Sequence, residues 1–554
     1  MPEQHIPQSA GPQSAGPQSA GLESAGPTRA FDVVIVGAGF AGLYMLHRLR
    51  SLGFSVRVFE AGGDVGGTWY WNRYPGARCD VESVQYSYQF DAALEQEWDW
   101  SERYAAQPEL LAYARHVAER FDLRRDIEFN TRISRARFEE ARGHWVLESA
   151  RGCSTANFCI MATGCLSAPN LPPFKGLDSF TGEHYHTGEW PHAGVDFTGK
   201  RVAVIGTGSS AVQSIPIIAR QAKQLYVFQR TPNYAVPAHN RPLDAQDRNK
   251  AKADYPAMRR RAKQTMTGID FDYSDQKALE TSAPERQREF ERRWTHGGLW
   301  FLGAYQDLMV DQQANDTAAE FVRGKIRARV DKPEVARLLA PQNTIGCKRL
   351  CVDIDYYETF NRENVTLVDV SRAPIEAIAA RGLRAGGVDY EVDAIVFATG
   401  FDAMTGTLLR IDIRGRNGLS LAEKWQDGPR SYLGLAIAGF PNLFTVTGPG
   451  SPSVLTNMLP SIEQHVEWIA DALLYARRRA IGRIEASSEA EDAWVEHVAE
   501  LAGRTLRYTC GSWYLGVNIA GKPRVFMPYI GGFPKYVERC KEIAGNGYEG
   551  FHLQ

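Results

Sequence analysis

The chain has 554 residues, of which 44% are hydrophobic and 23% are charged, a composition typical of a globular protein with two or three domains. Its formal net charge of −2 excludes the dominant basic surface of a protein that binds nucleic acid or an anionic membrane. No apolar run approaches the roughly 20 residues that cross a bilayer. We therefore expect a cytoplasmic monomer whose partners are small molecules rather than nucleic acid or membrane.

Residues 1–30 form a leader in which the pattern Gln-Ser-Ala-Gly-Pro repeats almost unchanged. The leader is rich in Pro, Gly and Ser and has hardly any large apolar side chains, so it cannot offset the entropy lost on ordering. It also lacks the basic start and the apolar stretch of a signal peptide. We expect the leader to be disordered and ordered structure to begin at Phe31.

A dinucleotide-binding fingerprint follows the leader. The apolar run 33–36 leads into the glycine-rich turn 37–42, and a helix is expected over 41–52. Glycines at this spacing allow a tight turn, a close approach of the backbone to a pyrophosphate and close packing of helix on strand. The next strand, 55–59, ends at an acid near the offset at which such a side chain binds the adenosine ribose. We assign to the first nucleotide, FAD, the residues Gly37, Gly39, Ala41, Gly42 and Glu60.

A second fingerprint follows the apolar run 202–205, and its next strand, 225–228, ends in Gln229-Arg230-Thr231 instead of an acid. An acid there would repel a ribose 2′-phosphate, whereas a guanidinium and a hydroxyl can bind one. NADPH is therefore favoured over NADH, and the alternative is that Arg230 is a solvated arginine at a strand end. The residues assigned to this nucleotide are Gly206, Thr207, Gly208, Ser209, Ser210, Ala211, Val212, Arg230 and Thr231.

Two similar runs, 160–164 and 394–400, each combine a buried strand with an Ala-Thr-Gly turn. In flavoproteins with two dinucleotide domains such turns mark where the chain passes between the domains. By that resemblance we expect an FAD domain over 31–164, an NADP domain over 165–400 and the rest of the FAD domain over 401–554. Periodic apolar positions predict a helical insertion at about 237–341. The predicted fold is α/β, with two doubly wound, Rossmann-like dinucleotide-binding domains.

The eight cysteines include no Cys-x-x-Cys pair, so neither a redox dithiol nor a zinc site is expected, and we expect no metal. Cys347 and Cys351 would be neighbours on a helix, but no second ligand pair follows them. Reduced, structural thiols are the better interpretation. The clustered aromatics after Gly66 and Gly67 suit either a chain that wraps a flat ring system or an aromatic core patch, and the pattern alone does not separate the two.

The segment 180–191 fits the pattern Phe-x-Gly-x-x-x-His-x-x-x-Trp-Pro, with Phe180, Gly182, His186, Trp190 and Pro191 in place. This pattern between two fingerprints resembles the signature of type I Baeyer–Villiger monooxygenases, which are class B flavoprotein monooxygenases. The resemblance covers essentially everything after the leader. It implies that NADPH reduces FAD, that O₂ forms a flavin C4a-peroxide, and that this species converts a ketone to an ester or lactone.

The resemblance also implies roles for single residues. Arg349 matches the family's active-site arginine, which would stabilise negative oxygen, and Asp80 matches the acid that positions it; the alternative is that Lys348-Arg349 is a surface dibasic step. His186 would lie on a linker that couples the two domains, without a catalytic role. The contacts implied for FAD are Thr68, Trp69, Tyr70, Trp71, Asp80, Tyr86, Ile133 and Met458, and those implied for NADP are Arg78, Cys79, Asp80, Lys348, Arg349 and Trp513.

Three other functions remain in view. A pyridine-nucleotide disulfide reductase would need a redox dithiol, which the cysteine spacings lack. A nucleotide-sensing module would not need Arg349 and Asp80 together. Oxygenation of nitrogen or sulfur is the alternative within the same chemistry. The sequence does not name the ketone, and we expect the loop 451–459 and the region of Trp513 to shape its pocket.

Deletion of the leader through Gly26 should change neither flavin content nor turnover, because the repeat cannot build a core. The measurement is the melting temperature (Tm) and flavin absorbance of the truncated and full-length proteins. A large fall in Tm on truncation would show that the leader docks on the folded protein.

Overall fold

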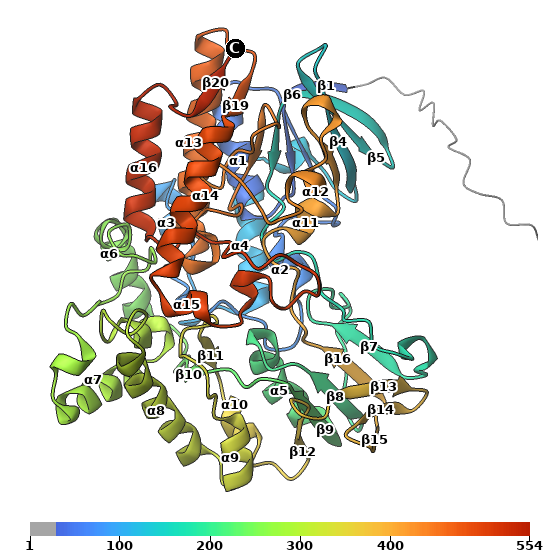
Figure 1. Cartoon of the computed structure of the whole chain (residues 1–554), viewed down its shortest axis with the longest axis vertical. Coiled ribbons are helices and arrows are strands. Elements are labelled where there is room, and N and C mark those ends of the chain that lie inside the picture. The colour runs from blue at the N-terminus through green and yellow to red at the C-terminus, as the bar shows by residue number, and fades with distance from the viewer. Residues whose placement is uncertain (1–28) are drawn as a thin grey trace, which may run out of the picture.

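The computed structural model describes residues 29–554 (Figure 1). The leader predicted to be disordered, residues 1–30, therefore lies outside the described residues except for Arg29 and Ala30. Arg29 and Ala30 belong to the first strand, where they pair with Ser154 and Thr155. The expected start at Phe31 is two residues late, because pairing with a long neighbouring strand extends β1 beyond its apolar core.

One eight-stranded mixed sheet lies in the upper half of Figure 1 and carries the first fingerprint. Its order is β17-β4-β5-β6-β1-β2-β3, and β18 also pairs with β6. Helix α1 begins directly after the glycine turn, and α13 packs against it. The strands are β1 (Arg29–Val36), β2 (Val56–Phe59), β3 (Ile127–Glu128), β4 (Ile133–Glu139), β5 (His144–Ser149), β6 (Gly152–Met161), β17 (Asp412–Arg414) and β18 (Leu443–Thr445).

A five-stranded parallel sheet lies in the lower half and carries the second fingerprint, with the order β12-β9-β8-β16-β7 (Figure 1). Its inner strands β8 and β16 are buried at every residue except half-buried Arg201, as expected of a parallel sheet covered on both faces. Its strands are β7 (Glu183–His186), β8 (Arg201–Ile205), β9 (Gln224–Gln229), β12 (Val365–Asp369) and β16 (Ala394–Phe397). Strand β10 (Ala235–Pro237) pairs with β11 (Cys351–Asp353), and β19 (Ile484–Ala486) pairs with β20 (Phe551–Leu553). In a further small sheet, β14 (Gly382–Ala385) lies between β13 (Ile375–Ala379) and β15 (Val388–Glu391) and pairs with both.

The chain passes between the two sheets twice, and the two passages run side by side. Pro169 and Phe401 form an antiparallel bridge, the N–H of Asn170 donates to Gly400 O (2.9 Å), and Thr399 Oγ1 donates to Asn170 O (2.5 Å). Each passage follows a strand that ends in an Ala-Thr-Gly turn. The paired passages give the two sheet units one common connection.

Helices dominate the stretch between β10 and β11, at the lower left of Figure 1. This agrees with the expected helical character of the stretch, whose apolar positions are buried on α7 and α8, as at Phe290 and Phe321. The helices of the described chain are α1 (Phe40–Ser51), α2 (Thr68–Trp71), α3 (Ala92–Glu97), α4 (Gln107–Arg120), α5 (Ser209–Gln221), α6 (Ala245–Ala262), α7 (Ala283–His296), α8 (Gln312–Arg329), α9 (Pro333–Leu339), α10 (Tyr356–Thr359), α11 (Gly406–Leu409), α12 (Leu421–Lys424), α13 (Met458–Arg478), α14 (Ser488–Gly503), α15 (Leu506–Thr509) and α16 (Phe533–Gly545).

Across residues 29–554, no helix is long and apolar enough to cross a bilayer.

The substitution Gly42→Ala should destabilise the fold, because a Cβ at this position would lie 1.9 Å from the carbonyl oxygen of Gly37. Forcing a side chain into such a space typically costs about 1–3 kcal/mol. The measurement is Tm, with Gly503→Ala as the control, since a Cβ there meets no atom within 4 Å on helix α14. The control should be neutral or slightly stabilising. Equal Tm values for both variants and the parent would contradict close packing of α1 on the glycine turn.

Candidate active site

A half-buried ion pair joins the two sheet units. Arg349 lies two residues before β11, whose pairing with β10 fixes the local chain direction. Its Nε and Nη2 donate to the two carboxylate oxygens of Asp80, with 2.8 Å between Nη2 and Oδ1. Its Nη1 donates to Val454 O at 2.7 Å. The guanidinium is therefore held from two sides by a bidentate carboxylate and a carbonyl, as a fixed positive group requires.

The environment of Arg349 keeps it charged. Burial alone would lower the pKa of its guanidinium, but the Asp80 carboxylate outweighs burial and the pKa lies above the ordinary value. The side chains of Arg349 and Asp80 are 24% and 21% exposed, so ligands can reach the pair. The site thus contains a permanent cation that does not depend on pH in the physiological range.

The segment that carries Asp80 is fastened to α5, the helix of the second fingerprint. The side-chain amide of Gln213 accepts from the Tyr74 hydroxyl (2.8 Å) and donates to Arg78 O (3.1 Å). Arg78 directs its own guanidinium to Glu102 and to Tyr104 O. These contacts bring Asp80, from the chain that follows the first fingerprint, next to the second nucleotide-binding unit.

The first fingerprint has the geometry of a pyrophosphate cradle. Gly37 has φ of +105°, and α1 begins at Gly39 with no side-chain cap and no acid in its first turn. The free N–H groups at such a helix start bind phosphate. Glu60 is buried at the end of β2 and accepts from Ala38 N (2.7 Å) and Gly62 N (2.6 Å). Burial raises the pKa of Glu60 and these hydrogen bonds oppose the rise; its carboxylate retains further lone pairs for a ribose.

The aromatic segment after Glu60 divides its side chains between two environments. Trp69 is buried in the core, where its Nε1 donates to the Tyr86 hydroxyl (3.3 Å), while Tyr70 and Trp71 are half-buried. The flat-ring and core-patch interpretations therefore each fit part of the segment. Ile133 is buried in the core at the start of β4, and half-buried Met458 is the first residue of α13.

The second fingerprint also leaves a helix start without a side-chain cap. Helix α5 begins at Gly208, where a Cβ would meet no atom within 4 Å, so the space beside this glycine is open. Ala211 is wholly buried against the sheet, which is the packing role of that position. Thr207 Oγ1 donates to Thr231 O (2.7 Å), so the two loops of this site are tied together.

Two cations gather beside this fingerprint. Arg230 is exposed at the end of β9, and Lys348 is half-buried. Burial lowers the pKa of Lys348, and the positive charge of Arg230 lowers it further, so the two charges lie close together. Within residues 29–554 neither forms a salt bridge with a carboxylate. A cation pair of this kind is complementary to a phosphate group.

The expectation that His186 lies on a linker is wrong. His186 is the last residue of β7, which is the edge strand of the second sheet. Its strand is held by pairing with β16. Its Nδ1 accepts from Gly188 N (3.0 Å), and its Nε2 lies 3.3 Å from Thr399 Oγ1 at the second passage between the sheets. The residue therefore braces the connection without being part of it. Burial lowers the pKa of His186, as suits a structural imidazole.

The expectation of reduced cysteines is wrong at one pair. Cys347 and Cys510 form a disulfide across 163 residues, and Cys347 and Cys351 do not share a helix. The pairing has no signal in sequence spacing, because the two residues meet only after both units have folded. The other six cysteines are free, including Cys351, which begins β11.

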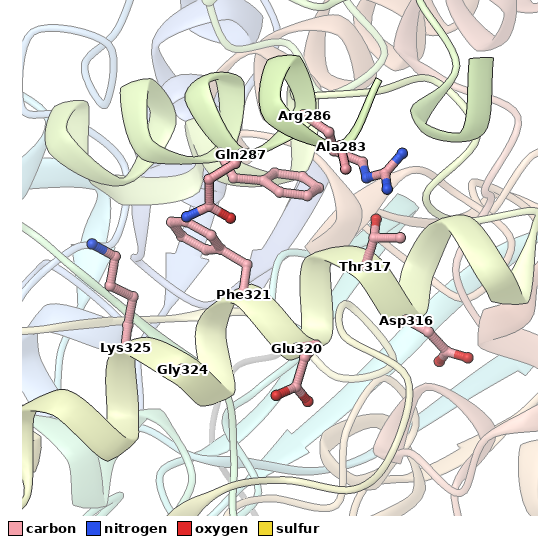
Figure 2. A pocket seen from close by; sticks show the side chains of 10 residues that line it. Ala283, Arg286, Gln287, Asp316, Thr317, Glu320, Phe321, Gly324 and Lys325 are labelled. Carbon is pink, nitrogen blue, oxygen red and sulfur yellow. The ribbon is translucent and has the colours of Figure 1, made fainter. Parts of the chain in front are cut away.

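Other residues at the site were not predicted individually. Tyr514 and Arg507 lie close enough to Arg349 to interact with it electrostatically. Val454, which accepts from Arg349, lies in the 451–459 loop expected to shape the pocket. By contrast, a hollow of about 670 Å³ between α7 and α8 lies within the helical stretch (Figure 2) and includes none of the predicted site residues.

Comparison with known proteins identifies relatives over nearly the whole chain. The family model "Pyridine nucleotide-disulphide oxidoreductase" matches residues 34–252. A Baeyer–Villiger monooxygenase of Pseudooceanicola batsensis is 42% identical over 94% of this chain and 95% of its own. An oxidized steroid monooxygenase bound to NADP is 53% identical with a TM-score of 0.90, covering 95% of this chain and 99% of its own. The enzyme OTEMO in complex with FAD and NADP is 40% identical with a TM-score of 0.92, over 95% and 100% of the two chains.

Two units with dinucleotide-binding fingerprints that meet at a half-buried arginine are typical of a flavin- and NADP-dependent oxidoreductase. The relatives narrow this class, and the chain belongs to the type I Baeyer–Villiger monooxygenases, with FAD and NADP as its cofactors. The disulfide-reductase alternative is not supported, because relatives over nearly the whole chain are monooxygenases and no Cys-x-x-Cys pair lies in the matched range 34–252.

Replacing Arg230 by alanine should raise the KM for NADPH severalfold and leave the KM for NADH nearly unchanged, because only NADPH carries the 2′-phosphate. The measurement is initial-rate oxidation of both nucleotides. Equal losses for the two nucleotides would contradict the assignment of Arg230 to the 2′-phosphate. Arg220→Ala is the control: within residues 29–554, the only salt bridge of this exposed arginine of α5 is a long one to Asp355 (3.9 Å).

Proposed function

We propose that this enzyme inserts one oxygen atom of O₂ beside the carbonyl of a ketone to give an ester or lactone, with Arg349 as the catalytic cation. The observation that carries the proposal is the bidentate pair between Arg349 and Asp80 at the meeting point of the two nucleotide-binding units. Bound FAD, reduced by NADPH, supplies the activated oxygen. The protein supplies orientation, exclusion of water and charge.

Arg349 holds the negative oxygen that develops during transfer to the carbonyl. A guanidinium does this without transferring a proton, because its pKa stays above any working pH. A preorganised charge in a partly dehydrated site stabilises the transition state more than the same charge in water would. Asp80 acts as the positioning residue, since it fixes the plane of the guanidinium through two of its N–H groups.

We assign FAD to the unit formed by 31–164 and 401–554, and NADP to 165–400, with the insertion at about 237–341. The uncapped start of α1 and the carboxylate of Glu60 support the first assignment. The open space at Gly208 and the cations Arg230 and Lys348 support the second. The FAD contacts proposed are the fingerprint residues with 68–71, Asp80, Tyr86, Ile133 and Met458; for NADP they are the second fingerprint with 78–80, Arg230, Thr231, Lys348, Arg349 and Trp513.

The substrate class is a ketone that reaches Arg349 past the loop 451–459 and the region of Trp513. The hydrogen bond from Arg349 to Val454 O supports the involvement of this loop. We further propose that the enzyme works as a cytoplasmic monomer. Oxygenation of nitrogen or sulfur compounds remains the second candidate, and a screen of aryl, cyclic and steroidal ketones, comparing NADPH oxidation with ester formation, separates it from the first.

Arg349→Ala should leave FAD bound and reduce ester formation by on the order of 10²–10³, the usual cost of removing one such electrostatic contact. Flavin reduction should also slow, because the same arginine is proposed to contact the nicotinamide nucleotide. Asp80→Ala should act in the same direction by releasing the guanidinium. The measurements are flavin absorbance, the rate of anaerobic flavin reduction and ester yield per NADPH.

Arg201→Ala provides the matched control. This arginine also forms a bidentate pair, with Asp393, but it lies at the start of β8 in the second sheet. Its loss should affect Tm rather than the yield of ester per NADPH. Near wild-type ester formation by Arg349→Ala would show that the proposed catalytic centre is wrong.

A further inference from the structure

The Cys347–Cys510 disulfide connects two segments that both belong to the candidate site. Cys347 directly precedes Lys348 and Arg349, and Cys510 follows α15, three residues before Trp513. The two Cα atoms are 6.0 Å apart although 163 residues separate them in sequence. The crosslink therefore lies beside the proposed nucleotide contacts, where a change in its state alters their relative placement.

Weaker contacts hold the same two segments together. Arg507 Nε donates to Gly346 O (3.0 Å), next to Cys347, and Leu506 N donates to Met309 O (2.9 Å), which lies shortly before α8. Neither hydrogen bond involves a disulfide sulfur, so reduction removes the covalent link and leaves only these weaker contacts to hold this end. Reduction should consequently loosen the segment that begins at Leu506 without unfolding it.

The far end of this segment is anchored to the passage between the two sheets. Asn518 Nδ2 donates to Phe401 O (2.8 Å), and Lys522 Nζ donates to Asp402 Oδ1 (2.6 Å). Between the two anchors, Trp513 is half-buried and its ring packs at a tilt against that of Tyr514, with 4.2 Å between ring centroids. The stretch 506–522 is thus a strap with one anchor at the connection of the units and the other at the disulfide.

The two sulfurs differ in accessibility. Cys347 is 1% exposed, whereas Cys510 is half-buried and can be reached by a small thiol. Five of the six free cysteines are buried, and burial raises the pKa of each of them, so they remain unreactive thiols: Cys79, Cys159, Cys165, Cys351 and Cys540. Cys153 is half-buried and serves as the comparison for unspecific thiol chemistry.

We propose that Cys347–Cys510 is a redox-controlled clamp that holds the strap 506–522, with Trp513, against Lys348 and Arg349 and thereby retains the NADP nucleotide. This inference rests on the proposed nucleotide site. Hydrogen peroxide closes the clamp: the two thiols lose two electrons and two protons to form the S–S bond, and the peroxide becomes two waters. A dithiol opens it by attacking the Cys510 sulfur, which releases Cys347–SH and leaves a mixed disulfide between Cys510 and the reagent. The second thiol of the reagent then displaces Cys510–SH, and the reagent becomes a cyclic disulfide.

The test compares the FAD-loaded protein after treatment with peroxide and after treatment with dithiothreitol, each followed by removal of the reagent. Peptide mass spectrometry measures the crosslink, and titration with NADP⁺, followed by the flavin spectrum, measures affinity. We expect NADP⁺ to bind about tenfold more weakly to the reduced form, a coupling of ordinary size. Cys347→Ser and Cys510→Ser should bind weakly after either treatment, and Cys153→Ser should respond like the parent.

Limited trypsinolysis provides a second readout that needs neither nucleotide nor ketone. Cleavage after Arg507 should accelerate on reduction, while cleavage after Arg142, an exposed residue between β4 and β5, should not change. Absence of the crosslink after peroxide, or a crosslink that changes neither affinity nor cleavage, would overturn the clamp. Failure of NADP⁺ to bind either form would contradict the nucleotide site itself, and the cleavage ratio would still decide whether the disulfide holds the strap.

Discussion

The bidentate contact between Arg349 and Asp80 is the constraint on which the rest of the site depends, because its two partners come from different parts of the fold. Asp80 follows the first fingerprint, and Arg349 precedes β11 after the long helical stretch. A partly buried guanidinium without a carboxylate partner would be destabilised by an uncompensated desolvation free energy. The pair therefore favours the arrangement in which both units face each other, which is also the only arrangement in which two nucleotides can react.

The same requirement explains the contacts around the pair. Gln213 on α5 fastens the chain before Asp80 to the second unit, and the two antiparallel passages near Asn170 and Thr399 give both units one connection. His186 supports that connection from the edge of the second sheet. Domains joined at one narrow connection move relative to each other by default. Specific polar contacts between them, from Gln213 and from the Arg349–Asp80 pair, then hold the two units in the observed arrangement.

The sequence was sufficient for the features that local chemistry determines. Each fingerprint combines a strand, a glycine turn and a helix within about 20 residues, so the cradle geometry at Gly37 and Gly208 followed from spacing alone. The class of enzyme and the pairing of Arg349 with Asp80 followed from family resemblance, since 269 residues separate the two. The strand position of His186, the Cys347–Cys510 disulfide and the proximity of Arg507 and Tyr514 were not predictable. The position of His186 depends on the pairing of β7 with β16, and the disulfide and the proximity of Arg507 and Tyr514 depend on how the two units dock. No periodicity or spacing in a single chain records either.

Asp80 neutralises the charge of Arg349, but the arginine can still stabilise an anion because not all of its N–H donors are used. A guanidinium has five N–H groups. Two are used by Asp80 and one by Val454 O, so two remain, one on each terminal nitrogen. Lysine has three donors without a fixed plane and could not hold a carboxylate and a carbonyl while still presenting two directed N–H groups. The carboxylate therefore weakens the long-range attraction for anions but fixes the two remaining donors in direction, and fixed donors are what a negative oxygen formed only in the transition state requires.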